Sequence, residues 1–164
     1  MESEMFVVEV VPECLTKLTE DTKGHWGIMG PQHMIEHLVG SWRISNGNAT
    51  VACNLPEIIL QQQRTFLFSE EPFEPNTKNP NLPEDDTLPL RKINLKEAII
   101  QLGSEIGDFF IYFDANSDVK TTHPVYGDLN RAQWLHFQLK HMGHHFKQFG
   151  LFEYKEGWLQ AFNS

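Results

Sequence analysis

The sequence predicts an all-α fold, a four-helix bundle in which amphipathic helices pack around one core. Apolar residues recur at helical spacing in several segments. No segment shows the sustained alternation, with β-branched residues, that is typical of a strand. Residues 70–90 contain five prolines and cannot form one helix, because proline fixes φ and lacks an amide donor. We therefore expect a long crossover loop there, within a single domain that spans residues 1–164.

The expected helices are bounded by residue types that start and stop helices. In chain order they span residues 12–19, 31–46, 56–68, 94–114 and 130–149. Pro31 suits a first helical turn, and Asn94 and Asn130 have side chains that cap the last two helices. Glu97 is the expected capping-box partner of Asn94. Residues 123–128 are rich in turn formers, and we expect a connection without strands.

Composition excludes several classes of protein. The formal net charge of −9 and the lack of a Lys/Arg run argue against nucleic acid as a partner. Residues 1–11 do not resemble a signal peptide, and no apolar stretch reaches the roughly 20 residues that span a membrane. Cys14 and Cys53 are far apart and form no CxxC motif, so we expect two reduced thiols in a cytoplasmic protein.

Histidines gather on the inward face of the last expected helix. His141 and His145 project into the arc of its apolar side chains, which are Leu135, Leu139, Met142, Phe146 and Phe149. The opposite arc, expected to face solvent, carries His136, Lys140 and Lys147. Side chains at i and i+4 lie about 5–6 Å apart, close enough for two neutral imidazoles to bind one divalent ion. The alternative is a chance pair in a chain with eight histidines.

A second pair with the same spacing, His33 and His37, lies on the helix expected at residues 31–46. On an ideal helical wheel His37 lies beside the apolar arc, whereas His33 lies about 40° further toward solvent. The wheel therefore favours His37 as the inward histidine. For His33 three alternatives stay open: a surface residue, a hydrogen-bonding neighbour of the site, or a fourth ligand.

The sequence resembles the DinB/YfiT-like superfamily of metal-binding helical bundles, in a branch known as a domain of unknown function. The segments that carry the resemblance are Trp26, residues 32–38 (QHMIEHL), residues 123–127 (HPVYG), Trp134 and residues 141–149 (HMGHHFKQF). The pattern HxxHHxxQ on a terminal helix is the most specific of them. The resemblance covers about residues 26–152.

The resemblance implies an up-down-down-up bundle in which three histidines bind a divalent ion, either nickel or zinc. Carried over by motif, the metal ligands are His37, His141 and His145, in agreement with the helical wheels. Relatives often form homodimers, so a homodimer is expected here. Many relatives have Arg-Gly where this chain has Phe146-Lys147, so an anion-binding arginine at that position is not implied.

Four further residues are candidates for contact with the site without being predicted ligands. His33 and His144 are candidates for orienting a ligand, although His144 has the alternative of facing a neighbouring helix. Gln148 is a candidate hydrogen-bond partner of a ligand or substrate. His123 lies before the last helix and either reaches the metal end of the bundle or is a turn residue fixed by Pro124.

Three histidine ligands leave a coordination position open, which is typical of catalytic sites. The ion can then activate the sulfur of a low-molecular-weight thiol for transfer to a small molecule, as in the bacillithiol- and mycothiol-dependent relatives. It can also generate hydroxide for hydrolysis. A module that binds a metal or small ligand without catalysis is the third alternative. No serine triad, phosphate loop or GxGxxG motif is present, which argues against serine hydrolysis and nucleotide chemistry.

Overall fold

The structure is a computed structural model that describes residues 2–76 and 87–153. Its elements, in chain order, are α1 (Glu2–Met5), the π-helical turn η1 (Phe6–Val10), α2 (Val11–Lys17), α3 (Pro31–Ser45), α4 (Glu57–Leu67), α5 (Leu95–Ala115), β1 (Thr121–His123), β2 (Gly127–Leu129) and α6 (Arg131–Gln148). No helix within these described ranges is long and apolar enough to cross a lipid bilayer.

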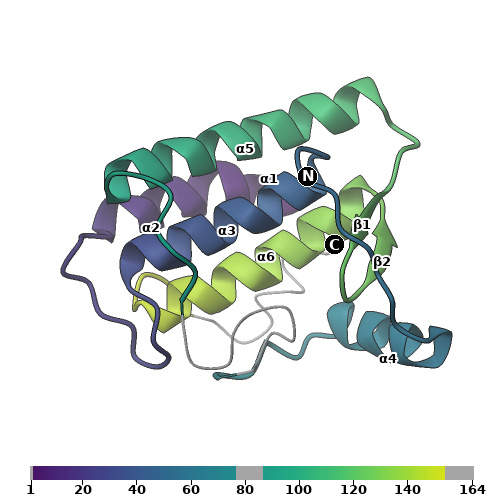
Figure 1. Ribbon diagram of the computed structural model, residues 1–164, viewed down its shortest axis with the longest axis horizontal. Helices are drawn as coiled ribbons and strands as arrows, with labels where there is room; N and C mark the ends of the chain where they lie inside the picture. Colours follow the sequence, from purple (N-terminus) through teal and green to yellow (C-terminus); the bar gives the residue numbers. More distant parts are fainter. Residues whose placement is uncertain (1, 77–86, 154–164) are drawn as a thin grey trace.

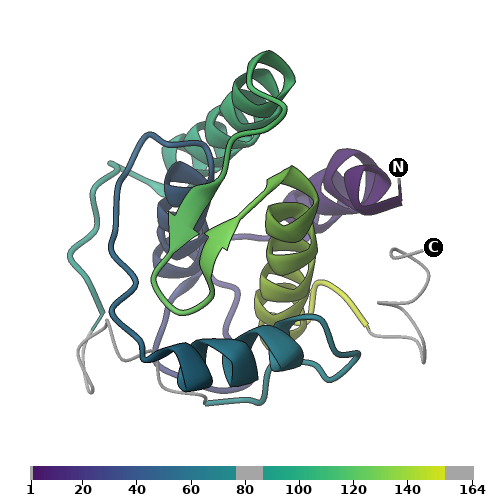
Figure 2. The ribbon, with the colours of Figure 1, turned by 90° about the vertical axis from the view of Figure 1, so that its right-hand side faces the viewer.

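The long helices α3, α5 and α6 lie side by side, with the N-terminal helical stretch formed by α1, η1 and α2 behind them (Figure 1). α3 packs against both α5 and α6, and α1 contacts α6. Their shared core is rich in aromatic rings, among which Trp42, Phe109 and Trp134 are fully buried. α4 lies apart from this group, next to the two strands and α6 (Figure 2).

The prediction of an all-α four-helix bundle is wrong, because the chain also forms a two-stranded antiparallel sheet. β1 pairs with β2 in the register Thr121↔Leu129 and His123↔Gly127, so residues 124–126 form the loop of a hairpin. Each strand has only three residues, too few for an alternating pattern to show in the sequence. Gly127 has a φ of +68°, and a Cβ there would lie 3.3 Å from Leu60 of α4.

The helix boundaries follow the capping signals of the sequence. The ends of α3, α4, α5 and α6 lie within one residue of the predicted ones. The Asn94 side chain accepts the Glu97 amide at 2.9 Å, and Asn130 forms a capping box with Gln133. The helical turns before Val11 were not predicted. In the expected crossover loop, residues 70–76 and 87–90 contain no helix or strand, and residues 77–86 lie outside the described residues.

The outer face of α6 was predicted to face solvent, and for two of its residues this is wrong. Lys140 and His136 are buried beneath the C-terminal end of α4, whereas Lys147 is exposed. The Lys140 ammonium donates to the carbonyl oxygens of Phe66 (2.8 Å), Leu67 (3.3 Å) and Ser69 (3.2 Å), and His136 Nε2 lies 2.8 Å from the Leu67 oxygen. A helix leaves its last carbonyls unpaired, and a cation at that end is favourable.

Burial lowers the pKa of Lys140 to about 8, and the nearby Glu71 carboxylate opposes that shift. The ammonium also lies 4.2 Å from the centre of the Phe66 ring, in cation–π contact. Lys140 therefore connects α6 to the end of α4 and to the start of the following loop. A helical wheel of α6 could not predict the burial of Lys140, because the residues that bury it belong to α4.

We predict that Lys140→Met destabilises the fold by about 2–3 kcal/mol, because the carbonyl oxygens of Phe66, Leu67 and Ser69 lose a charged donor. The measurement is urea unfolding followed by circular dichroism. The matched control is Lys147→Met on the exposed face of the same helix, with an expected change within about 0.5 kcal/mol. Equal stability of the two variants would contradict the assignment.

Candidate metal centre

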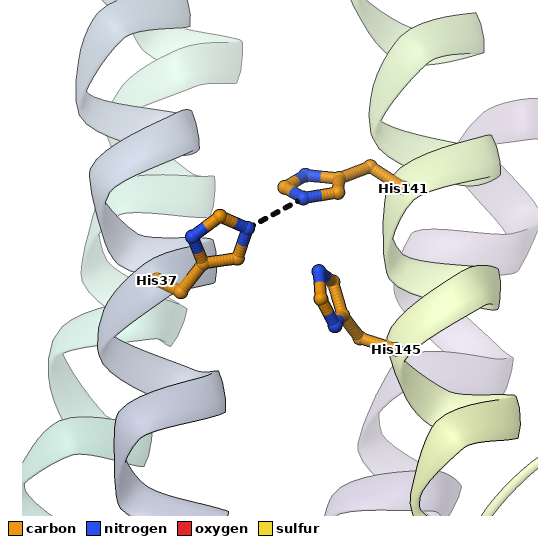
Figure 3. Close-up of side chains that lie close together, drawn as sticks. All are labelled: His37, His141 and His145. Atoms are coloured by element: carbon orange, nitrogen blue, oxygen red, sulfur yellow. Dashed lines mark hydrogen bonds between the residues drawn. The ribbon is translucent and has the colours of Figure 1, made fainter. Parts of the chain in front are cut away.

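Three histidine side chains from two helices converge between α3 and α6 (Figure 3). They are His37 of α3 and His141 and His145 of α6, and one ring nitrogen of each lies within 4.8 Å of the other two. The Nε2 atoms of His37 and His141 are 2.9 Å apart. The structure thus brings together the three residues that the sequence predicted as ligands. That they bind a metal stays a prediction.

The packing of α3 against α6 puts these rings opposite one another. One turn beyond His37, Ser41 donates a hydrogen bond from its hydroxyl to Oε1 of Gln138, at 2.9 Å. The contact residue on α3 moves from His37 to Ser41 while its partner on α6 moves from His141 to Gln138. The residue numbers rise on one helix and fall on the other, so the two helices are antiparallel. On both sides of this polar seam the helices bury large apolar side chains, which fix the spacing.

Gln148 orients His145 toward the cluster. Its amide nitrogen donates to the backbone oxygen of Trp26 at 2.8 Å, and a carbonyl can only accept, so the amide orientation is determined. Oε1 of Gln148 then faces Nδ1 of His145 at 2.9 Å, which must carry the proton. The Nε2 lone pair of His145 is therefore free for a ligand, and in Figure 3 that side of the ring faces the other two histidines.

Gly27 allows this approach of the loop before α3 to the end of α6. It has a φ of +77°, which favours glycine, and a Cβ there would lie 2.8 Å from Nε2 of Gln148. Any larger residue would push against the amide that orients His145. The conformation of residues 24–27 is therefore part of the site.

Burial keeps the three rings neutral. It lowers the pKa of His37 to about 4, with a smaller contribution from His144. Burial likewise lowers the pKa of His141, with repulsion from His145 next in size, and that of His145, with repulsion from His37 next, both well below the usual range. Neutral imidazole is the form that binds metals.

The residues present fit a divalent metal ion. Nitrogens bound to one zinc ion at about 2.0–2.1 Å lie roughly 3–3.5 Å from each other, close to the 2.9 Å between His37 and His141. Three neutral imidazoles are a donor set suited to zinc or nickel. Nδ1 of His141 is buried without a hydrogen-bond partner, so stacking on Phe137, with ring centres 5.1 Å apart, orients this ring.

The other sequence candidates lie around the cluster but outside it. His33 is half-buried in the first turn of α3 and is not among the converging histidines. His144 has its Nδ1 3.1 Å from the backbone oxygen of Phe73, so it faces a neighbouring loop. Glu36, next to His37, is turned away and accepts the backbone amides of Arg91 and Lys92.

His123 is buried in the hairpin and reaches the cluster only through an intervening ring. Its Nδ1 accepts the backbone amides of Val125 (3.0 Å) and Tyr126 (3.2 Å), which is the arrangement of a turn residue. Its ring packs on Phe137 with centres 4.5 Å apart, and Phe137 in turn stacks on His141.

Sequence reasoning missed the aromatic contacts of the site. Phe73 follows α4 and lies with its ring centre 6.4 Å from that of His141 and 6.0 Å from that of His144. The only signal for it was an aromatic residue between Pro72 and Pro75 in an otherwise polar stretch. Its position depends on the fastening of α4 to α6, which no local pattern encodes.

One protein family matches part of the chain. Residues 91–150 match a family described as a protein of unknown function (DUF1569). The match covers α5, the hairpin and α6, and so includes His141, His145 and Gln148 but not His37. It spans less than half of the chain. No curated protein and no solved structure matches.

We predict that His123 makes the fold acid-sensitive. Burial lowers its pKa from 6.5 to about 3, and the two amides that donate to Nδ1 favour the same neutral form. Below pH 6.5 the unfolded chain takes up a proton that the folded chain does not. Stability is then lost as the pH falls toward about 3, by up to about 1.4 kcal/mol per pH unit.

The measurement is urea unfolding at pH 7, 6 and 5 with a metal chelator present, for the parent and for His123→Asn. Asparagine keeps an acceptor for the two amides but does not titrate. We expect the variant to be less stable at pH 7, because ring packing is lost, and to lose less stability on acidification. The cluster histidines are common to both proteins, so most of their contribution cancels in the difference; what remains is the small effect of His123 on the pKa of His141. Parallel pH profiles would refute the assignment.

Proposed function

We propose that this protein binds one divalent metal ion, nickel or zinc, through His37, His141 and His145, and that the ion serves a reaction of a small molecule. The observation that carries the proposal is the convergence of three ring nitrogens, all within 4.8 Å of one another, from two antiparallel helices. Burial favours the neutral form of each ring, and Gln148 fixes the tautomer of His145. The resemblance to DinB/YfiT-like bundles points to the same three ligands.

A site of this kind is suited to catalysis because the described residues supply three ligands. His37 and His141 are half-buried, so part of each of these two residues stays accessible to solvent. A divalent ion held there would be a Lewis acid that lowers the pKa of a coordinated thiol or water molecule, so that its proton could pass to solvent. The protein's own contribution is to hold the three imidazoles neutral, oriented and close together.

Transfer of a low-molecular-weight thiol to a small molecule is the reaction we propose. Among the described residues the converging group contains three histidines and no carboxylate, and Glu36 is occupied by the backbone of Arg91 and Lys92. A thiol that coordinates a metal would give up its proton to solvent completely, whereas a metal-bound water would do so only in part near neutral pH, so we favour thiol transfer over hydrolysis. The DinB/YfiT resemblance includes thiol-dependent members and supports the same choice.

Hydrolysis by a metal-bound hydroxide is the second candidate, and a metal-binding module without catalysis is the third. An exchangeable water or thiol on the bound ion separates both enzymes from the module. A cytoplasmic location and a homodimer, both expected from the sequence and its resemblance, complete the proposal.

We predict that the protein purified without a histidine tag contains about one equivalent of nickel or zinc. The double variant His141→Ala/His145→Ala should lose it, because one ligand cannot hold the ion. The matched control is His33→Ala, which removes a half-buried histidine of α3 outside the cluster and should keep the metal. Elemental analysis after dialysis measures all three proteins. A parent that stays empty after incubation with each ion would rule out the proposed function.

We further predict that Gln148→Leu weakens metal binding by about 10- to 100-fold, because His145 loses the acceptor that fixes its tautomer. Competition with a chromophoric chelator measures the affinity. Gln61→Leu, which removes an exposed glutamine on α4, is the matched control and should leave the affinity unchanged. Equal affinities in the two variants would show that Gln148 does not orient a ligand.

A further inference from the structure

We propose that Trp26, Phe73 and Phe137 form an aromatic subsite beside the histidine cluster, and that it binds an uncharged aromatic group of the molecule that reacts at the metal. The inference rests on the proposed function and specifies its substrate class. It is carried by five ring contacts in and around the cluster, to which three separate segments of the chain contribute the aromatic rings.

The three rings border the cluster on the α6 side. Phe137 stacks on His141, with centres 5.1 Å apart, and Phe73 lies 6.4 Å from His141 and 6.5 Å from Phe137. Trp26 lies 5.8 Å from His144, on which Phe73 also packs at 6.0 Å. Aromatic rings from the loop before α3, the loop after α4, and α6 itself thus lie beside the histidines of α6.

Trp26 and Phe73 both lie in loops, and both are half-buried. Each is held at the site through its own backbone. The carbonyl oxygen of Trp26 accepts from Gln148, and that of Phe73 lies 3.1 Å from Nδ1 of His144. Rings that stay partly exposed while their backbones are fixed to the residues of a site are typical of a preorganised ligand pocket.

Among the described residues, the charged group that lies against the subsite already has partners, which favours an uncharged ligand group. The Lys140 ammonium is bonded to three carbonyl oxygens and lies 5.6 Å from the centre of the Phe73 ring, so its field opposes a second cation there. With those three oxygens as its partners, Lys140 is engaged and is not offered to an anionic group of a ligand.

The test compares two hydroxamates on the zinc-loaded protein by isothermal titration calorimetry. Acetohydroxamate and benzohydroxamate bind a metal through the same group, and they differ only in a methyl or a phenyl substituent. We expect benzohydroxamate to bind at least about ten-fold more tightly, from burial of its ring. Phe73→Ala and Trp26→Ala should each reduce that preference to about two-fold or less while the bound zinc is retained.

Phe68→Ala is the matched control. Phe68 follows α4 as Phe73 does, but it is exposed and packs on His136, which is not one of the converging histidines. This variant should keep the full preference. Phe73→Leu keeps apolar volume without a ring and serves if the alanine variant does not fold. It should lower the preference by about three-fold or more.

Equal binding of the two hydroxamates by the parent, or a preference that survives both alanine variants, would overturn the aromatic subsite. Loss of zinc from Phe73→Ala or Trp26→Ala would also overturn it, because the rings would then shape the metal ligands and not the substrate pocket. A parent that binds no zinc by elemental analysis removes the proposed function, and the subsite with it. The zinc content and the hydroxamate ratio thus distinguish the two failures.

Discussion

The antiparallel packing of α3 on α6 is the contact on which the rest of the structure depends. It places His37 opposite His141 and Ser41 opposite Gln138, so that polar side chains meet in pairs within an apolar interface. A buried polar group is costly unless it is paired, so this seam fixes the register of the two helices. α5 extends this pair by packing along α3, and the C-terminal end of α4 covers part of α6.

A buried charged side chain, Lys140, holds the end of α4 against α6. Lys140 is completely buried, yet its bonded partners in the described part of the chain are backbone oxygens at or just after the end of α4, with no carboxylate among them. The interaction combines a helix C-terminus, which carries partial negative charge, with a desolvated ammonium group. It places the loop that carries Phe73 within reach of the histidine cluster. The aromatic surroundings of the site are thus a consequence of how α4 ends.

The sequence indicated those parts of the molecule that depend on local chemistry. Caps at Asn94 and Asn130 marked the helix ends, and two helical wheels selected His37, His141 and His145 as neighbours. The features that the sequence did not predict depend on contacts between segments that are distant in the chain. The hairpin has strands of three residues, and its fold relies on Gly127 lying against Leu60 of α4. The burial of Lys140 and His136, and the approach of Phe73, likewise depend on α4, whose placement no periodicity within α6 reveals.

The three histidines have a further consequence for the folding of the chain. His37 and His141 are separated by 104 positions in the sequence. Their contact therefore closes a long loop of the chain, which contains α4, α5 and the hairpin. On the proposed function, an ion held by both histidines would close that loop in the folded state. Because such an ion would bind only the native arrangement, it would stabilise the fold by mass action, and the free energy of unfolding would then depend on metal supply.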